Sequence, residues 1–171
     1  MSRTSDYSIV AAGAEHEPFL REALYYAAHM DEEPNVRPES AKTNPALNPY
    51  VVDWRGRAGD LGFVAVTNSG SPAGVAWLRL MPPDWPLYRY VTCDIPELAI
   101  AVLPRYLGRG MGSELLRVLI EASSALHPAI VLSVRHNNPA RRLYERIGFH
   151  PVANITNRVG GTSVVMKLDL R

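Results

Sequence analysis

Apolar residues occur along this chain in short runs and in helical stripes, and the two patterns predict a protein that mixes strands with helices. Runs of roughly four to eight apolar residues bounded by turn formers are typical of strands. Such runs predict strands at residues 7–12, 61–67, 73–81, 97–103, 129–134, 149–153 and 162–170. The polar segment Asn68-Ser-Gly-Ser-Pro72 predicts that the second and third strands form a hairpin.

Apolar residues with the helical period predict helices over residues 17–30, 111–126 and 138–147. Asn138 and Pro139 suit the start of the last helix, and Gly148 suits its end. Strands and helices are intermingled along the whole chain, and no second core is evident. We therefore expect one α/β (α+β) domain over residues 1–171, with a mixed sheet and helices on both of its faces.

The most informative polar pattern is a glycine-rich turn between a predicted strand and a predicted helix. Gly108, Gly110 and Gly112 follow the strand at 97–103, and the helix begins at Met111. Glycine permits close backbone approach and positive φ, and a helix N-terminus offers free N–H groups to an anion. The turn therefore predicts a site for a phosphorylated cofactor, with a tight turn that binds nothing as the alternative. Its spacing is not that of the dinucleotide fingerprint.

A second segment resembles the GCN5-related N-acetyltransferase (GNAT) family. The family signature Asn-x-x-Ala-x-x-Leu-Tyr-x-x-x-Gly-Phe is matched from Asn137 to Phe149. The family's acetyl-CoA loop, Arg/Gln-x-x-Gly-x-Gly/Ala, aligns with the segment from Leu107 to Gly112, about 25 residues earlier. Leu107 departs from the usual Arg or Gln, and Arg105 or Arg109 is a candidate for the missing charge.

The resemblance implies a mostly antiparallel sheet whose two central strands splay apart to hold acetyl-CoA. It places the acetyl-CoA-binding core at about residues 97–152 and the acceptor-side loops at about 31–60 and 82–95. Residues of one strand are implied to contact the cofactor through their backbone, with one N–H polarising the thioester carbonyl: Ile100, Ala101 and Val102. Amides of the glycine loop are implied to bind the pyrophosphate: Leu107, Gly108, Arg109, Gly110, Met111, Gly112 and Ser113. Asn137 is implied to contact the cofactor arm.

The implied reaction moves an acetyl group from acetyl-CoA to a primary amine of a small molecule or peptide, by direct attack in a ternary complex. Tyr144 resembles the family's general acid, with a core tyrosine as the alternative. Glu97 is the candidate general base, with a solvated strand-end carboxylate as the alternative and Asp94 as a weaker candidate. A different reading of the whole chain is a noncatalytic acyl-CoA-binding sensor or interaction module.

Aromatic and acidic residues gather in and around the expected acceptor loops. Two roles are open for the aromatic residues: they line an acceptor pocket, or they pack in the core or within the loops. These residues are Trp54, Trp77, Trp85, Tyr88 and Tyr90. The carboxylates of Asp31, Glu32 and Glu33 are candidates for attracting a cationic acceptor.

Composition narrows the class of protein. The net charge of +1 does not favour nonspecific binding of nucleic acid, and no apolar run approaches the roughly 20 residues that span a bilayer. Cys93 is the only cysteine, so no intrachain disulfide can form, and the first residues lack the apolar core of a signal peptide. We therefore expect a soluble, cytoplasmic protein without a metal, and the family resemblance allows a homodimer.

Overall fold

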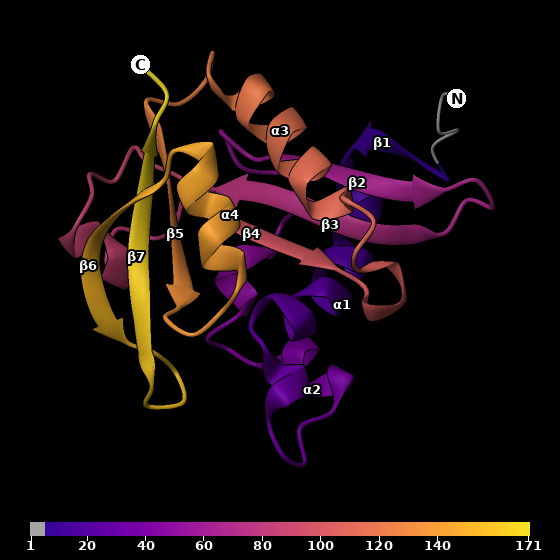
Figure 1. Ribbon diagram of the computed structural model, residues 1–171, viewed down its shortest axis with the longest axis horizontal. Helices are drawn as coiled ribbons and strands as arrows, with labels where there is room; N and C mark the ends of the chain where they lie inside the picture. The colour runs from indigo at the N-terminus through magenta and orange to yellow at the C-terminus, as the bar shows by residue number, and fades with distance from the viewer. Residues whose placement is uncertain (1–5) are drawn as a thin grey trace.

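The computed structural model describes residues 6–171 and contains a seven-stranded sheet in the order β1-β2-β3-β4-β5-β7-β6 (Figure 1). The strands are β1 (Tyr7–Ala11), β2 (Leu61–Thr67), β3 (Pro72–Arg79), β4 (Glu97–Val102), β5 (Ala129–Arg135), β6 (His150–Thr156) and β7 (Thr162–Asp169). All neighbouring strands are antiparallel except β4 and β5, which are parallel.

The parallel strands β4 and β5 meet at one point and then diverge. Their register contains the pair Glu97 and Val131, and the Val131 N–H donates to the Pro96 carbonyl at 3.1 Å. On its other side, β4 pairs with β3 along its whole length. Beyond Glu97, the edge of β4 that faces β5 therefore has no partner strand among the described residues. This geometry confirms the mixed, mostly antiparallel sheet with a splayed central pair.

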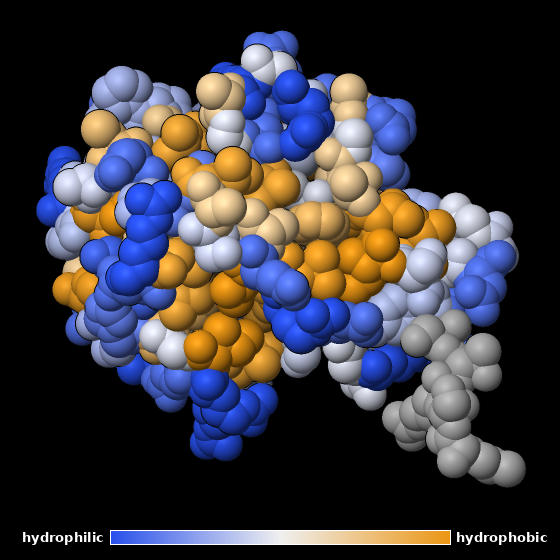
Figure 2. All heavy atoms as spheres, turned by 90° about the horizontal axis from the view of Figure 1, so that it is seen from above, coloured by the Kyte–Doolittle hydropathy of each residue, from blue (hydrophilic) through white to orange (hydrophobic). Residues whose placement is uncertain are grey.

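Helices cover both faces of the sheet. On one face, α1 (Glu17–Ala27) and α2 (Pro38–Thr43) lie over a core in which Leu20 packs with Trp77 and Ala101. On the opposite face, nearer the viewer in Figure 1, α3 (Met111–Ser123) and α4 (Ala140–Ile147) bury Leu115 and their other apolar residues. Seen from above, Figure 2 shows hydrophobic residues across the middle of this face, with hydrophilic residues around them.

The element boundaries differ from the expected ones for local reasons. Helix α1 ends at Ala27 rather than at residue 30, because His29 adopts a left-handed conformation with φ 56°. Helix α4 begins at Ala140 with Pro139 as its N-cap, one residue later than expected, and the Ala140 N–H donates to Asn138 Oδ1 at 2.9 Å. Gly148 ends α4 with φ 118°, in the left-handed region that glycine favours.

The loop regions contain several single turns of 3-10 helix that place side chains near the sheet. They are η1 (Ala14–His16), η2 (Met30–Glu32), η3 (Asn48–Tyr50), η4 (Pro86–Arg89) and η5 (Pro104–Tyr106). Prolines occur in the first turn of η3, η4 and η5, where the missing N–H costs no hydrogen bond. The proline-rich loops are thus folded against the sheet, which brings η3 and η4 toward the start of β4.

Candidate active site

Glu97 lies at the point where β4 and β5 meet, and its carboxyl group is buried. The residue is 4% exposed. Its Oε1 accepts a hydrogen bond from the Tyr50 hydroxyl at 2.9 Å, and its Oε2 accepts one from Trp85 Nε1 at 2.6 Å. A solvated strand-end carboxylate is therefore not what the structure contains.

Burial raises the pKa of Glu97 to about 7. The two hydrogen bonds favour the charged carboxylate and act in the opposite direction, but the effect of burial is larger. Taking a carboxylate out of water disfavours its charged state, and neither donor brings a positive charge to offset that cost. Near neutral pH the group is present in both protonation states. A carboxyl group with this pKa is suited to accepting a proton at physiological pH.

Two loop residues hold the Glu97 carboxylate. Tyr50 comes from η3, Trp85 precedes η4, and their rings meet edge to face with centroids 5.4 Å apart. Trp77 Nε1 donates to the Tyr50 carbonyl at 2.9 Å, so the buried face of β3 fixes the η3 backbone. Burial, with the neighbouring Glu97 charge, raises the pKa of Tyr50 well above its usual value. Tyr50 therefore remains a neutral donor.

A buried ion pair lies beside this group. Arg79 Nε donates to Asp60 Oδ1 at 3.0 Å, and its Nη2 donates to Oδ2 at 2.9 Å. Arg79 Nη1 donates to the carbonyls of Pro49, at 3.3 Å, and Val52. The arginine thus holds the backbone on both sides of Tyr50. The bidentate geometry is the stronger form of this ion pair.

The glycine turn presents a row of free backbone N–H groups. Gly108 and Gly110 have φ of 77° and 78°, and Gly110 is the N-cap of α3. The amides from Gly108 to Ser113 make no hydrogen bond within the described residues, whereas the Leu107 N–H donates to the Pro104 carbonyl at 3.3 Å. A phosphate-sized anion would therefore meet free amides from Gly108 onward.

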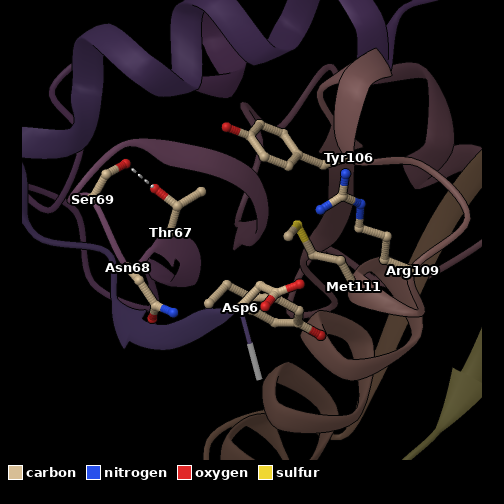
Figure 3. A pocket seen from close by; sticks show the side chains of 8 residues that line it. Asp6, Thr67, Asn68, Ser69, Tyr106, Arg109 and Met111 are labelled. Carbon is tan, nitrogen blue, oxygen red and sulfur yellow. Dashed lines mark hydrogen bonds between the residues drawn. The ribbon is translucent and has the colours of Figure 1, made fainter. Parts of the chain in front are cut away.

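Arginines flank the glycine turn, and hollows lie on both of its sides. Arg105 and Arg109 both lie over the Tyr106 ring, 5.2 and 5.6 Å from its centroid. Figure 3 shows Tyr106, Arg109 and Met111 around an open pocket of about 360 Å³ that the β2–β3 hairpin completes. A second hollow, of about 370 Å³, lies between α3 and α4, where Ser113 of α3 and Leu143 of α4 are among its lining residues.

Tyr144 and Asn137 belong to the second sequence signature. The Tyr144 ring packs edge to face on Phe149, with centroids 5.8 Å apart, and burial raises its pKa to about 12. Tyr144 is 8% exposed, and its hydroxyl makes no hydrogen bond to another group within residues 6–171. Asn137 is exposed in the turn between β5 and α4, while the next residue, Asn138, contacts His29 through its amide at 2.9 Å.

The remaining candidates from the sequence have mixed outcomes. Trp54 and Trp77 are core residues, at 3% and 0% exposure, whereas Trp85 contacts Glu97. Glu32 forms an ion pair with Arg135, and Glu33 forms ion pairs with Arg135 and Arg158. Attraction of a cationic acceptor by Asp31, Glu32 or Glu33 stays a prediction.

Two absences apply to the part of the chain from residue 6 to residue 171. No group of three or more His, Cys, Asp or Glu side chains is placed to hold a metal ion. None of its helices has the length and apolar character needed to cross a bilayer.

Sequence reasoning missed Tyr50, Arg79 and Asp60. Arg79 carried a usable signal, since it is a charged residue within the apolar run at 73–81. Tyr50 and Asp60 lie in irregular segments with no motif. Tyr50 is 47 residues from Glu97 in the sequence, and Asp60 is 19 residues from Arg79. Only the folded chain brings these side chains together.

Comparison with known proteins points to one family. The acetyltransferase (GNAT) family model matches residues 23–149, and no curated protein matches the chain by sequence. An N-acetyltransferase from Staphylococcus aureus has a similar structure, with 25% identity, a TM-score of 0.68, and coverage of 98% of this chain and 100% of that one.

Two further structures share the fold at lower identity. A Salmonella typhimurium protein solved with acetyl-CoA has 21% identity, a TM-score of 0.65, and coverage of 98% and 95%. A spermidine/spermine N-acetyltransferase from Vibrio cholerae has 18% identity, a TM-score of 0.64, and coverage of 96% and 93%. At these identities the likeness concerns the fold.

Proposed function

Since this chain belongs to the acetyltransferase (GNAT) family, we propose that it transfers an acetyl group from acetyl-CoA to a primary amine by direct attack in a ternary complex. The observation that carries the proposal is Glu97, a buried carboxyl group at the closed end of the splayed strands whose pKa is raised to about 7. A noncatalytic binding module has no need of such a group.

Acetyl-CoA supplies a thioester whose acetyl carbon is the electrophile. In our proposal, the unpaired edge of β4 at Ile100, Ala101 and Val102 binds the cofactor arm, and Asn137 contacts it from the turn before α4. The free amides from Gly108 to Ser113 bind the pyrophosphate. Leu107 contributes less to pyrophosphate binding, because its amide already donates to the Pro104 carbonyl. The residues present thus fit the cofactor.

Two side chains would handle protons. An alkylamine is protonated at neutral pH, because its pKa is about 10, and must lose a proton before it attacks. Glu97 accepts that proton, directly or through a water molecule. Tyr144, whose pKa is about 12, stays protonated at physiological pH and donates its hydroxyl proton toward the departing sulfur.

We place the acceptor among small-molecule primary amines. The Vibrio cholerae enzyme of the same fold acts on polyamines, as its name states. The described acceptor-side loops place two neutral donors, Tyr50 and Trp85, at the Glu97 carboxylate. A peptide acceptor, a homodimer and a cytoplasmic location stay predictions.

Free thiol released from acetyl-CoA in the presence of an amine panel tests the proposal. We expect saturable, amine-dependent release by the purified protein. Saturable acetyl-CoA binding without release for any amine would instead support the sensor reading.

Tyr144→Phe is expected to lower kcat by about 10²-fold or more, because the thiolate then leaves without an acid. The hydroxyl makes no hydrogen bond within residues 6–171, so its removal leaves the ring packing on Phe149 intact. Acetyl-CoA affinity by calorimetry and the Tm should stay near wild type. An unchanged kcat would show that Tyr144 is only a core residue.

Gly110→Ala is expected to weaken acetyl-CoA binding about tenfold, because a left-handed backbone costs an L-residue about 1–2 kcal/mol and the loop amides would shift. Gly70→Ala is the matched control, since Gly70 also has a positive φ, 90°, and open space around it, at the tip of the β2–β3 hairpin. Calorimetric titration of both variants with acetyl-CoA compares them. Equal affinity in the two would refute the phosphate loop.

A further inference from the structure

Arg79 stands directly opposite Glu97 in the β3–β4 ladder, yet the two charged groups do not pair. In an antiparallel ladder, opposed side chains share a face of the sheet, with Cβ atoms about 4.5–5.5 Å apart. A guanidinium so placed is within reach of the carboxylate and is its natural partner. Here it turns to Asp60 instead.

Asp60 is built to hold the arginine. Its Oδ2 also accepts the backbone N–H groups of Arg55, at 2.9 Å, and Arg57, at 3.4 Å. The side chains of Asp60 and Arg79 are 2% and 1% exposed. Every guanidinium nitrogen of Arg79 has an acceptor, in Asp60 or in the carbonyls of Pro49 and Val52.

Glu97, in turn, receives only neutral donors among the described residues. Tyr50 faces it from η3 and Trp85 from the loop before η4, and Tyr88 of η4 lies near enough to feel its charge. The neighbouring strand β3 places the cation Arg79 opposite Glu97, but the Asp60 carboxylate neutralises that cation. An unopposed cation within about 4–6 Å would lower the pKa of a carboxyl group by about 1–3.

We propose that Asp60 is a positioning residue for acetyl transfer: by holding the Arg79 guanidinium, it keeps that cation from pairing with Glu97 and leaves the carboxylate free to take a proton from the amine. This inference rests on the proposed function of Glu97 as the base. It assigns a role to a residue that touches neither the cofactor arm nor the amine.

The test compares Asp60→Asn with the double variant Asp60→Asn/Arg79→Gln. In the single variant Arg79 is free to pair with Glu97, so the acidic limb of the pH profile of kcat/KM should move down by about 1–3 pH units. The plateau rate should fall about tenfold, because a weaker base accepts the proton less readily. In the double variant the cation is gone, and the limb should return to its wild-type position.

A direct readout accompanies the kinetics. The side-chain carboxyl of Glu97, assigned by its loss in Glu97→Gln, is titrated by carbon-13 NMR in each protein. The proposal would be overturned if Asp60→Asn folds and its Glu97 carboxyl titrates at the wild-type pH. It would also be overturned if the Glu97 titration of the double variant differs from wild type by more than about one pH unit. Should Asp60→Asn not fold, Asp60→Ser, which leaves room for a water molecule beside the guanidinium, takes its place in the same titration and is judged by the same outcomes.

The two proposals fail in different ways. If Glu97→Gln retains full turnover, Glu97 is not the base, yet the NMR titration still reports whether Asp60 controls its protonation. If Glu97→Gln is inactive and the Glu97 titration is the same in wild type and Asp60→Asn, Glu97 remains the proposed base and the proposed role of Asp60 is wrong.

Discussion

Glu97→Gln is expected to lower kcat/KM for the acceptor amine by about 10²- to 10⁴-fold, the range that a general base contributes. Glutamine has nearly the shape of glutamate but accepts no proton at physiological pH. The wild-type rate should rise with pH through about 7, as the carboxyl group loses its proton, and this limb should be absent from the variant. Steady-state kinetics from pH 5.5 to about pH 9 measures both effects.

Asp94→Asn is the matched control for this variant. Asp94 is the other carboxylate considered for the role, but it is exposed and its Oδ1 accepts a short-range hydrogen bond from Thr92. We expect its rate and pH profile to stay near wild type, with acetyl-CoA affinity unchanged in both variants. If Asp94→Asn lost the activity and Glu97→Gln kept it, the assignment of the base would be reversed.

The same group makes stability depend on pH. Because the folded protein holds the Glu97 proton more tightly than the unfolded chain does, its contribution to the free energy of unfolding is retained below about 4.5 and lost as pH rises through about 7. Glu97→Gln should remove this component from the pH dependence of urea unfolding.

Arg79→Met is expected to lower the free energy of unfolding by about 3–5 kcal/mol, because it leaves the buried Asp60 carboxylate without its partner. The carbonyls of Pro49 and Val52 lose a donor as well. For a chain of this size the Tm should fall by about 10 °C. Thermal and urea unfolding by circular dichroism measure the loss.

An exposed arginine provides the control for this prediction. Arg117 pairs with Glu121 at 3.3 Å, but the two side chains are 64% and 78% exposed. Arg117→Met should change the free energy of unfolding by less than about 1 kcal/mol, as solvated pairs do. A comparable loss in both variants would mean that the buried pair contributes nothing special.

Local patterns predicted most of the secondary structure, because strand alternation and helix periodicity depend on nearby residues. The strand expected at 61–67 is β2 (Leu61–Thr67), and the glycine turn indeed leads into α3 at Met111. Glu97 was identified from its place at the start of a strand. The splay of β4 and β5 was accessible only through the family resemblance, since no local pattern states where two strands stop pairing.

The surroundings of Glu97 were beyond prediction from a single sequence. Tyr50 reaches the carboxylate across 47 positions of chain, through a proline-rich loop whose path depends on Trp77 and Arg79. The burial that raises the pKa of Glu97 is likewise a property of the assembled core. The ion pair of Glu33 was hidden for the same reason, because its partner Arg158 lies 125 positions away.

The single meeting point of β4 and β5 has a mechanical consequence. It divides the sheet into two antiparallel halves, β1 to β4 and β5 to β7, that share one backbone pairing at Glu97 and Val131. Each half is a unit with its own hydrogen-bond ladder, and apart from this pairing the two are held together by side-chain packing in a common hydrophobic core. A molecule that bridges the gap ties the two units together, so occupancy should slow amide exchange on both sides of the seam at once.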